Sequence, residues 1–216
     1  MVVQAKICGI ATPETLAVAA KAGAAAVGFV FYRRSPRYVT QDQAAALARA
    51  TPEGVERVGL LVDPGDDELA GLLAAVPLTL LQLHGHEDPA RVVAIRQRFA
   101  TPVMKVVAIA EAADLEQARA YEPVADWLLF DAKPPAAMTN ALPGGNAIAF
   151  DWRLIAAAPR FRRPWMLSGG LTPQTVGEAV AISGARYVDV SSGVESAPGV
   201  KDPERIRSFL EACRTA

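Results

Sequence analysis

The chain has 216 residues, and its 22 Lys and Arg nearly balance its 23 Asp and Glu, so the formal net charge is −1. This balance creates no overall field for nucleic acid or anionic lipid, and we expect neither a nucleic acid nor a membrane as a partner. No apolar stretch reaches the roughly 18 to 20 residues of a transmembrane helix, and the first residues lack a signal-peptide pattern. Two cysteines, Cys8 and Cys213, allow at most one disulfide. We therefore expect a cytoplasmic protein with reduced thiols.

Short runs rich in β-branched and aromatic residues alternate along the chain with segments of helical spacing. The strand-like runs cover residues 2–8, 25–32, 56–63, 78–85, 102–109, 125–132, 163–170 and 185–192. The helical segments cover residues 12–23, 40–50, 66–76, 87–99, 112–121 and 172–184. Thr12 and Thr172 each precede a proline and are predicted N-caps, and Gly23 and Gly184 are predicted to end their helices.

The runs VGFVFY and WLLF are apolar at every position or nearly so, which is typical of strands covered on both faces of a parallel sheet. Eight such runs predict a single-domain (β/α)₈ TIM barrel over residues 1–216. An open doubly wound sheet is the alternative, but only one glycine follows the first run, in GIAT, where a dinucleotide fold carries a glycine-rich fingerprint. One long irregular segment, residues 133–152, contains three prolines and two adjacent glycines, and loops of this length are usually functional or mobile.

Ligands of a parallel barrel bind over the carboxyl ends of its strands, so polar residues at those ends are the candidate site residues. They are Cys8, Arg37, Asp63, His84, Asp131, Ser168–Gly170 and Asp189.

Two glycine loops, SGG at Gly169 and Gly170 and SSG at Ser192 and Gly193, follow the last two predicted strands. Unpaired backbone N–H groups in such loops bind phosphate, and barrels often hold a phosphate between the loops after strands seven and eight. Either loop alone could use its glycine simply to permit a tight turn. Two such loops on consecutive strands favour a phosphate site.

Cys8 and Asp131 are the acid–base candidates. A cysteine at a strand end can act as a thiolate base where cations lower its pKa, and alternation points Lys6 the same way, although a buried structural thiol is the common alternative. Asp131 follows four apolar residues, so its carboxyl group must face the ligand or find a partner such as Lys133.

His84 and His86 lie two residues apart without the third ligand of a zinc motif, and we expect no metal site. His84 is predicted to line the pocket and His86 to be solvated. Arg37 belongs to RRSPRY, where an arginine could clamp a carboxylate with two hydrogen bonds or simply face solvent.

Seven motifs taken together resemble those of a known protein family, which composition and spacing alone do not identify. They are KICGI, GFVFYRRSPRYV, VGLLVD, LQLHGHE, FDW, LSGGLTPQTV and VDVSSGVESAPGVKD. In order and spacing, from Lys6 to Asp202, they resemble the phosphoribosylanthranilate isomerase family of tryptophan biosynthesis. The resemblance implies a (β/α)₈ barrel that catalyses an Amadori rearrangement of a phosphosugar substrate, N-(5-phosphoribosyl)anthranilate, without metal or organic cofactor.

By the same resemblance, Cys8 is the general base, Asp131 is the general acid and Arg37 holds the anthranilate carboxylate. His84 and Asp189 line the substrate site.

The resemblance further implies that Gly169, Gly170, Ser192 and Gly193 hold the phosphate. The chain departs from the family pattern at Ala147, where a glycine usually stands before FDW, and this makes the conformation of that loop an open question.

Two other functions remain open from the sequence. An indole-glycerol-phosphate synthase needs catalytic lysine and glutamate at strand ends, and Lys105 is the only strand lysine besides Lys6. A non-catalytic phosphate-ligand binding protein would use Cys8 only structurally. The choice between a monomer and a homodimer is also open.

Overall fold

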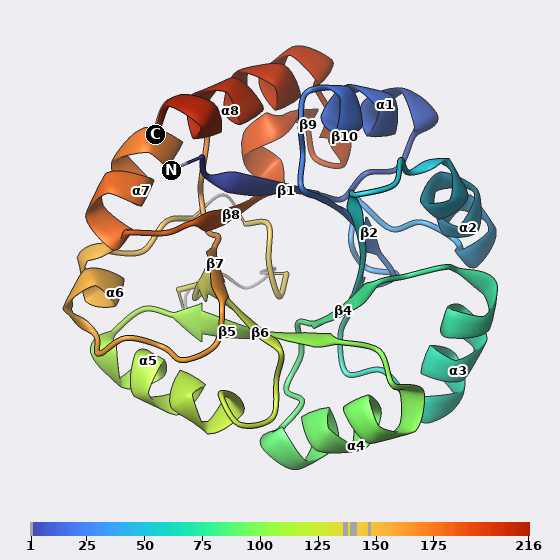
Figure 1. The fold of residues 1–216 in the computed structure, drawn as a ribbon, viewed down its shortest axis with the longest axis horizontal. Helices are drawn as coiled ribbons and strands as arrows, with labels where there is room; N and C mark the ends of the chain where they lie inside the picture. The colour runs from blue at the N-terminus through green and yellow to red at the C-terminus, as the bar shows by residue number, and fades with distance from the viewer. Residues whose placement is uncertain (1, 136–137, 139–141, 147) are drawn as a thin grey trace.

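A computed structural model describes residues 2–135, 138, 142–146 and 148–216. Within this part of the chain, eight parallel strands pair in sequence order and close into a barrel, because β1 pairs with both β2 and β8. Helices surround the barrel (Figure 1). The predicted (β/α)₈ fold is therefore confirmed.

The barrel strands are shorter than the apolar runs that predict them. They are β1 (Gln4–Cys8), β2 (Ala26–Val30), β3 (Glu56–Leu61), β4 (Leu80–Leu83), β5 (Val103–Ile109), β6 (Trp127–Ala132), β7 (Trp165–Leu167) and β8 (Tyr187–Val190). The helices are α1 (Pro13–Lys21), α2 (Gln41–Ala50), α3 (Asp66–Ala75), α4 (Pro89–Phe99), α5 (Ala112–Ala118), α6 (Arg153–Ala157), α7 (Val176–Ser183) and α8 (Pro203–Thr215), with 3₁₀ turns η1 (Arg119–Tyr121) and η2 (Ser192–Val194).

The helix ends follow local sequence signals, with one exception. Thr12 caps α1 by accepting a hydrogen bond from the backbone N–H of Thr15, and Gly184 ends α7 with a positive φ of 70°. Thr172 makes the predicted capping bond, because its hydroxyl accepts from the N–H of Thr175 at 3.2 Å, but regular helix α7 begins only at Val176. The N–H of Thr172 also donates to the hydroxyl of Thr175 (3.0 Å), so the two threonines form a turn ahead of the helix.

Three elements lie outside the predicted segments. The short helix α6 follows the long segment between β6 and β7, and α8 ends the chain. A small antiparallel sheet of β9 (Glu195–Ala197) and β10 (Val200–Lys201) follows η2. This hairpin extends the loop after β8 over the pocket end of the barrel, where Lys201 donates a hydrogen bond to the carbonyl of Ser191.

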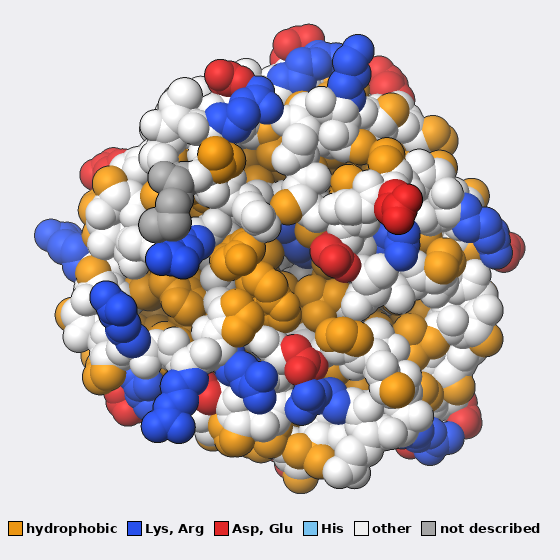
Figure 2. Space-filling view, viewed as in Figure 1, with side chains coloured by type: hydrophobic (Ala, Val, Ile, Leu, Met, Phe, Trp, Pro, Cys, Tyr) orange, Lys and Arg blue, Asp and Glu red, His pale blue; other side chains and the backbone are white. Residues whose placement is uncertain are grey.

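Apolar side chains form two cores. The larger core lies between the strands and the surrounding helices, and the smaller one fills the barrel interior with residues such as Val58, Met104 and Leu129. Seen as in Figure 2, hydrophobic side chains gather in the middle of this face and most Lys and Arg side chains lie around its rim. Among the described residues, no helix is both long and apolar enough to cross a membrane.

Candidate active site

The alternation of side chains along the strands builds the site. Every second residue points into the barrel, and these inward positions change from apolar to polar toward the carboxyl ends of several strands. The pairs that show this change are Leu80 and Gln82 on β4, Leu129 and Asp131 on β6, Met166 on β7 and Ser168 after it, and Tyr187 and Asp189 on β8. Four strands therefore each present a polar side chain at the same end of the barrel.

A pocket of about 740 Å³, including its open mouth, lies at this end. All but two of the candidate site residues line it, namely Cys8, Arg37, His84, Asp131, Ser168, Gly169, Gly170, Asp189 and Ser192. Asp63 lies outside it, beside the exposed His86. Gly193 instead lines an adjoining hollow that Gly170 and Ser192 share. The pocket thus brings together residues from both ends of the chain.

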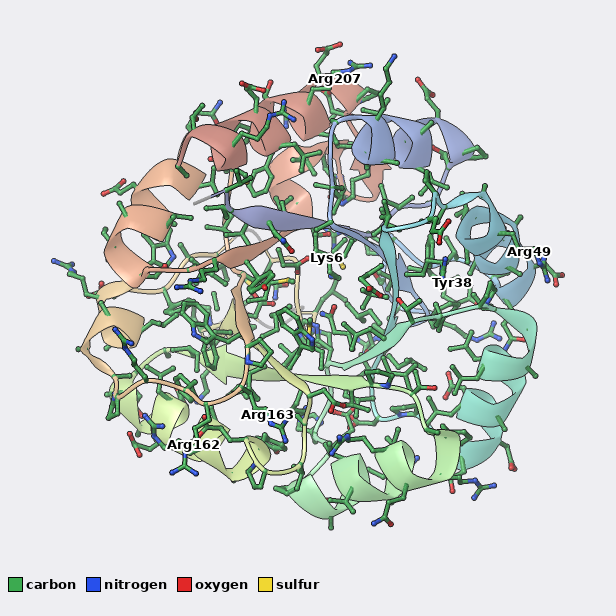
Figure 3. The ribbon with its side chains drawn as sticks, viewed as in Figure 1. Lys6, Tyr38, Arg49, Arg162, Arg163 and Arg207 are labelled. Carbon is green, nitrogen blue, oxygen red and sulfur yellow. The ribbon has the colours of Figure 1, made fainter. Side chains whose placement is uncertain are left out.

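Cys8 is 4% exposed and lies beside a buried ion pair. Lys6, two residues earlier on β1, points into the centre of the barrel (Figure 3) and its Nζ donates to Oδ1 of Asp189 at 2.8 Å. Burial raises the pKa of the Cys8 thiol, and Asp189 adds to this effect, whereas Lys6 and Lys201 act in the opposite direction. The thiol therefore depends on its neighbouring cations to ionise.

Gly28 on β2 makes room for this arrangement. It pairs with Cys8 in the barrel, and a Cβ at this position would lie 3.1 Å from Sγ of Cys8 and 3.2 Å from Cε of Lys6. The missing side chain leaves the space that the thiol and the lysine stem occupy.

Asp131 is 6% exposed, and Lys133 does not pair with it. Its Oδ1 accepts a hydrogen bond from the N–H of Ala132 (2.9 Å), and its Oδ2 lies 3.5 Å from Nε2 of His84. Lys133, the partner considered from the sequence, bonds to Asp114 at 2.9 Å because it points outward toward the start of α5. Oδ2 thus faces the pocket and His84.

His84 and His86 have separate environments. Nε2 of His84 is buried and makes no hydrogen bond within the described residues, and its Nδ1 lies 3.5 Å from Nε2 of Gln82. His86 is exposed and lies 3.1 Å from Oδ2 of Asp63. Gln82 also has a buried Oε1 without a partner among the described residues, so two polar atoms of this wall can accept or donate to a ligand.

Arg37 is buried and paired within the protein. Its Nε and Nη2 donate to the two carboxylate oxygens of Glu195 at 2.7 and 2.9 Å, and Nη2 also approaches the carbonyl of Gly145 at 3.3 Å. Glu195 in turn accepts from Nζ of Lys201 at 2.7 Å. Since Glu195 occupies one edge of the guanidinium, Nη1 is the donor that remains for a ligand.

Part of the long segment after β6 lies against the pocket. A Cβ at Gly144 would lie 2.4 Å from Cε1 of His84 and 2.8 Å from Oδ2 of Asp131, and one at Gly145 would lie 2.5 Å from Nη1 of Arg37. The two glycines thus let the backbone approach three candidate site residues closely. Ala147, whose effect on this loop the sequence leaves open, lies outside the described residues.

The two glycine loops contact each other. Gly169 and Gly170 have φ angles of 89° and 64°, which glycine adopts without strain, and a Cβ at Gly193 would meet the carbonyl oxygen of Leu171. Between described residues, no hydrogen bond outside the regular elements uses the N–H of Gly169, Gly170 or Gly193. Unpaired backbone N–H groups of this kind are donors that an anion can bind.

Lys105 does not belong to the pocket. It points away from the barrel interior, and its Nζ bonds to the carbonyl of Gly85 and to Glu87, both at 2.7 Å. The lysine that an indole-glycerol-phosphate synthase would need is therefore not at the ligand end of β5.

Sequence reasoning did not identify Gln82, Glu195 and Lys201 as site residues. Gln82 could have been found by the alternation of β4, since it lies two residues before His84. Glu195 and Lys201 lie in a hairpin beyond the last barrel strand, and no pattern of strands and helices places them near Arg37.

Comparison with known proteins agrees with this geometry. Residues 5–212 match the family model of N-(5'-phosphoribosyl)anthranilate (PRA) isomerase. The N-(5'-phosphoribosyl)anthranilate isomerase of Paramagnetospirillum magneticum is 55% identical over 214 residues, which cover 99% of this chain and 98% of that protein.

Solved structures of phosphoribosylanthranilate isomerases are also similar to this chain. The crystal structure of phosphoribosylanthranilate isomerase from Thermotoga maritima superposes with a TM-score of 0.88 at 35% identity, covering 99% of this chain and all of that one. A phosphoribosylanthranilate isomerase in complex with reduced 1-(o-carboxyphenylamino)-1-deoxyribulose 5-phosphate superposes with a TM-score of 0.86 at 34% identity, with 99% and 100% coverage. The Thermotoga maritima enzyme is dimeric. The chain therefore belongs to the phosphoribosylanthranilate isomerase family.

Proposed function

We propose roles for the pocket residues in the reaction of this family. The chain converts N-(5-phosphoribosyl)anthranilate to 1-(2-carboxyphenylamino)-1-deoxyribulose 5-phosphate in tryptophan biosynthesis. Cys8 is the general base and Asp131 the general acid. The observation that supports this assignment is that both groups line one pocket together with Arg37 and residues of the two glycine loops.

In the first step Asp131 donates its proton to the ring oxygen of the ribose. The bond between C1′ and that oxygen breaks, and the lone pair of the anthranilate nitrogen forms a C1′=N iminium. Support for this role comes from the environment of Asp131, whose Oδ2 faces the pocket and makes no ion pair with Lys133.

In the second step the Cys8 thiolate removes the proton from C2′, which the neighbouring iminium has made acidic. The electrons of the C–H bond form a C1′=C2′ bond and neutralise the nitrogen. The resulting enolamine gains a proton at C1′ as the C2′ hydroxyl loses one, which yields the ketone. The rearrangement moves protons and electrons within one molecule, so an acid and a base balance it without a metal or an organic cofactor.

Anchors at both ends hold the substrate for these transfers. Nη1 of Arg37 is the donor for the anthranilate carboxylate, and the loops at Gly169, Gly170, Ser192 and Gly193 receive the phosphate. Asp189 and the wall formed by His84 face the sugar between them. The strand order supports this arrangement, because β1, which carries Cys8, lies between β8, which a glycine loop follows, and β2, which the Arg37 loop follows.

We further propose that the chain forms a single domain, acts in the cytoplasm and assembles as a homodimer. The buried free thiols of Cys8 and Cys213 support a reducing compartment, and the dimeric Thermotoga maritima relative supports the assembly. Sedimentation analysis tests the assembly directly.

A fluorescence assay that follows consumption of the anthranilate substrate tests the catalytic roles. Cys8→Ser is expected to lose turnover while it still binds the reduced product analogue, because serine keeps the shape but is a far weaker base at neutral pH. Cys213→Ser is the matched control, since Cys213 is equally buried but lies on α8 away from the pocket. Undiminished turnover of Cys8→Ser would remove Cys8 from the base role.

A further inference from the structure

The charges beside Cys8 form two groups with different net charge. Lys6 and Asp189 are one cation and one anion, joined at 2.8 Å, so their charges cancel. In the second group, Glu195 bonds to both Arg37 and Lys201, each at 2.7 Å, and no other carboxylate of the described residues bonds to either cation. This second group therefore carries one uncompensated positive charge at the edge of the pocket.

Lys201 also has a direct structural link to Cys8. All three N–H donors of its ammonium have partners, which are Oε1 of Glu195 (2.7 Å), the carbonyl of Ser191 (2.9 Å) and the hydroxyl of Ser191 (3.2 Å). The hydroxyl of Ser191 donates in turn to the carbonyl oxygen of Cys8 at 3.1 Å. One side chain thus separates the ammonium from the backbone that carries the thiol.

We infer that Lys201 is a positioning residue for the catalytic base, which holds the backbone of Cys8 through Ser191 and stabilises its thiolate with an uncompensated positive charge. This inference rests on the proposed role of Cys8 as the base. It adds a residue of the β9–β10 hairpin, beyond the last barrel strand, to the machinery of proton removal.

Opposing effects act on the ionisation of the neighbouring groups. Burial lowers the pKa of Lys201 and Arg37 adds to this effect, whereas the Glu195 carboxylate and the Cys8 thiolate favour the charged ammonium. The groups that face Cys8 are Lys6 from its own strand, Asp189 from β8 and Lys201 from β10, and His84 and Asp131 line the same pocket from β4 and β6. Lys6 also favours the thiolate, but its removal would leave Asp189 buried without its partner. Removal of Lys201 leaves Glu195 paired with Arg37, so Lys201 is the cleaner position to change.

The test measures ionisation of the thiol without substrate. The ultraviolet absorbance of the thiolate is followed against pH as the difference between each protein and the same protein carrying Cys8→Ser. We expect Lys201→Met to move the midpoint of the Cys8 titration to higher pH by about one unit. At a fixed pH below the midpoint, this shift corresponds to about tenfold less thiolate. Lys201→Arg is expected to have a midpoint close to that of the wild-type protein, because arginine keeps the positive charge.

Lys105→Met is the matched control, since Lys105 is also buried and bonded to a carboxylate at 2.7 Å but does not approach Cys8. An equal shift in Lys105→Met and Lys201→Met would overturn the inference, as would a wild-type midpoint in Lys201→Met. If Lys201→Met fails to fold, Lys201→Gln provides the same test, because it keeps a donor for Ser191 and removes the charge.

The pH dependence of kcat/KM separates this inference from the proposed function. Its acidic limb is expected to move with the thiol midpoint in Lys201→Gln or Lys201→Met. If Cys8→Ser keeps full turnover, the base assignment fails. If Cys8→Ser loses turnover while the limb and the thiol midpoint stay unchanged in the Lys201 variants, only the role of Lys201 fails.

Discussion

Gly28→Ala should impair catalysis without removing any catalytic group. Gly28 pairs with Cys8 across β1 and β2, and its new Cβ would lie 3.1 Å from Sγ of Cys8, 3.2 Å from its Cα and 3.2 Å from Cε of Lys6. Ordinary van der Waals contact begins at 3.4 Å, so these atoms must give way by a few tenths of an ångström. The thiol and its nearest cation would therefore both be displaced.

The size of the effect follows from this overlap. A misplacement of 1 Å costs about a hundredfold in rate, so a few tenths of an ångström predict a kcat about five- to tenfold lower. Overpacking of a filled interior costs about 1–3 kcal/mol of unfolding free energy, which corresponds to a Tm about 2–12 °C lower for a chain of this size.

Steady-state kinetics and thermal unfolding of the purified variant measure both effects. Gly71→Ala is the control, because Gly71 lies in exposed α3 and a Cβ there meets nothing within 4 Å. This control should keep wild-type kcat and gain about 0.5–1 kcal/mol of stability from helix propensity. A Gly28→Ala enzyme with lowered Tm but wild-type kcat and thiol titration would refute the reasoning that this space positions the base.

Three further changes test separate parts of the structure. Asp131→Asn should lower kcat by about 10²- to 10⁴-fold with KM within a few-fold of wild type, and a wild-type kcat would show that another group protonates the ring oxygen. Arg37→Ala should raise KM at least about tenfold, and an unchanged KM would remove Arg37 from the carboxylate site. Burial opposes ionisation of Asp114, but hydrogen bonds from Lys133 and two backbone amides hold its pKa below the usual value. The contribution of Asp114 to stability is therefore present above its unfolded-state pKa near 4 and is lost as pH falls through its folded-state pKa. Denaturant unfolding of Asp114→Asn should show an unfolding free energy about 1–3 kcal/mol lower than that of the wild-type protein at pH 7, and this difference should shrink in acid.

Much of the barrel follows from the apolar runs, because a strand buried on both faces needs little else to be recognised. The inward positions of Cys8 and Asp131 follow as well, since the two-residue period of a strand fixes which side chains share a face. The runs overestimate strand length at β7, where only Trp165–Leu167 are paired, because Ser168 and the glycines after it turn toward the pocket.

The partners of the charged site residues could not be predicted from sequence. RRSPRY indicates a carboxylate ligand for Arg37, but the carboxylate within reach is Glu195, which is 158 residues away. Lys133 stands two residues from Asp131 and would share its face in a continuing strand, but β6 ends at Ala132 and Lys133 turns away to bond to Asp114. Neighbours in sequence are poor guides to ion pairs in a parallel barrel, because adjacent residues of a strand point to opposite sides of the wall and the chain changes direction where the strand ends.

The two faces of the barrel wall also keep two buried lysines in separate environments. Lys105 and Lys6 are both buried strand lysines, but one closes the wall against Glu87 and the other meets Asp189 inside the barrel. A buried ion pair contributes little net stability, because desolvation of both charges offsets their attraction. The pair inside the barrel therefore requires a different explanation from stability, and its position beside the Cys8 thiol supplies one. Lys6 lowers the free-energy cost of forming the thiolate and Asp189 raises it, so the pair fixes a cation beside the thiol while the net positive charge comes from the group of Arg37, Glu195 and Lys201.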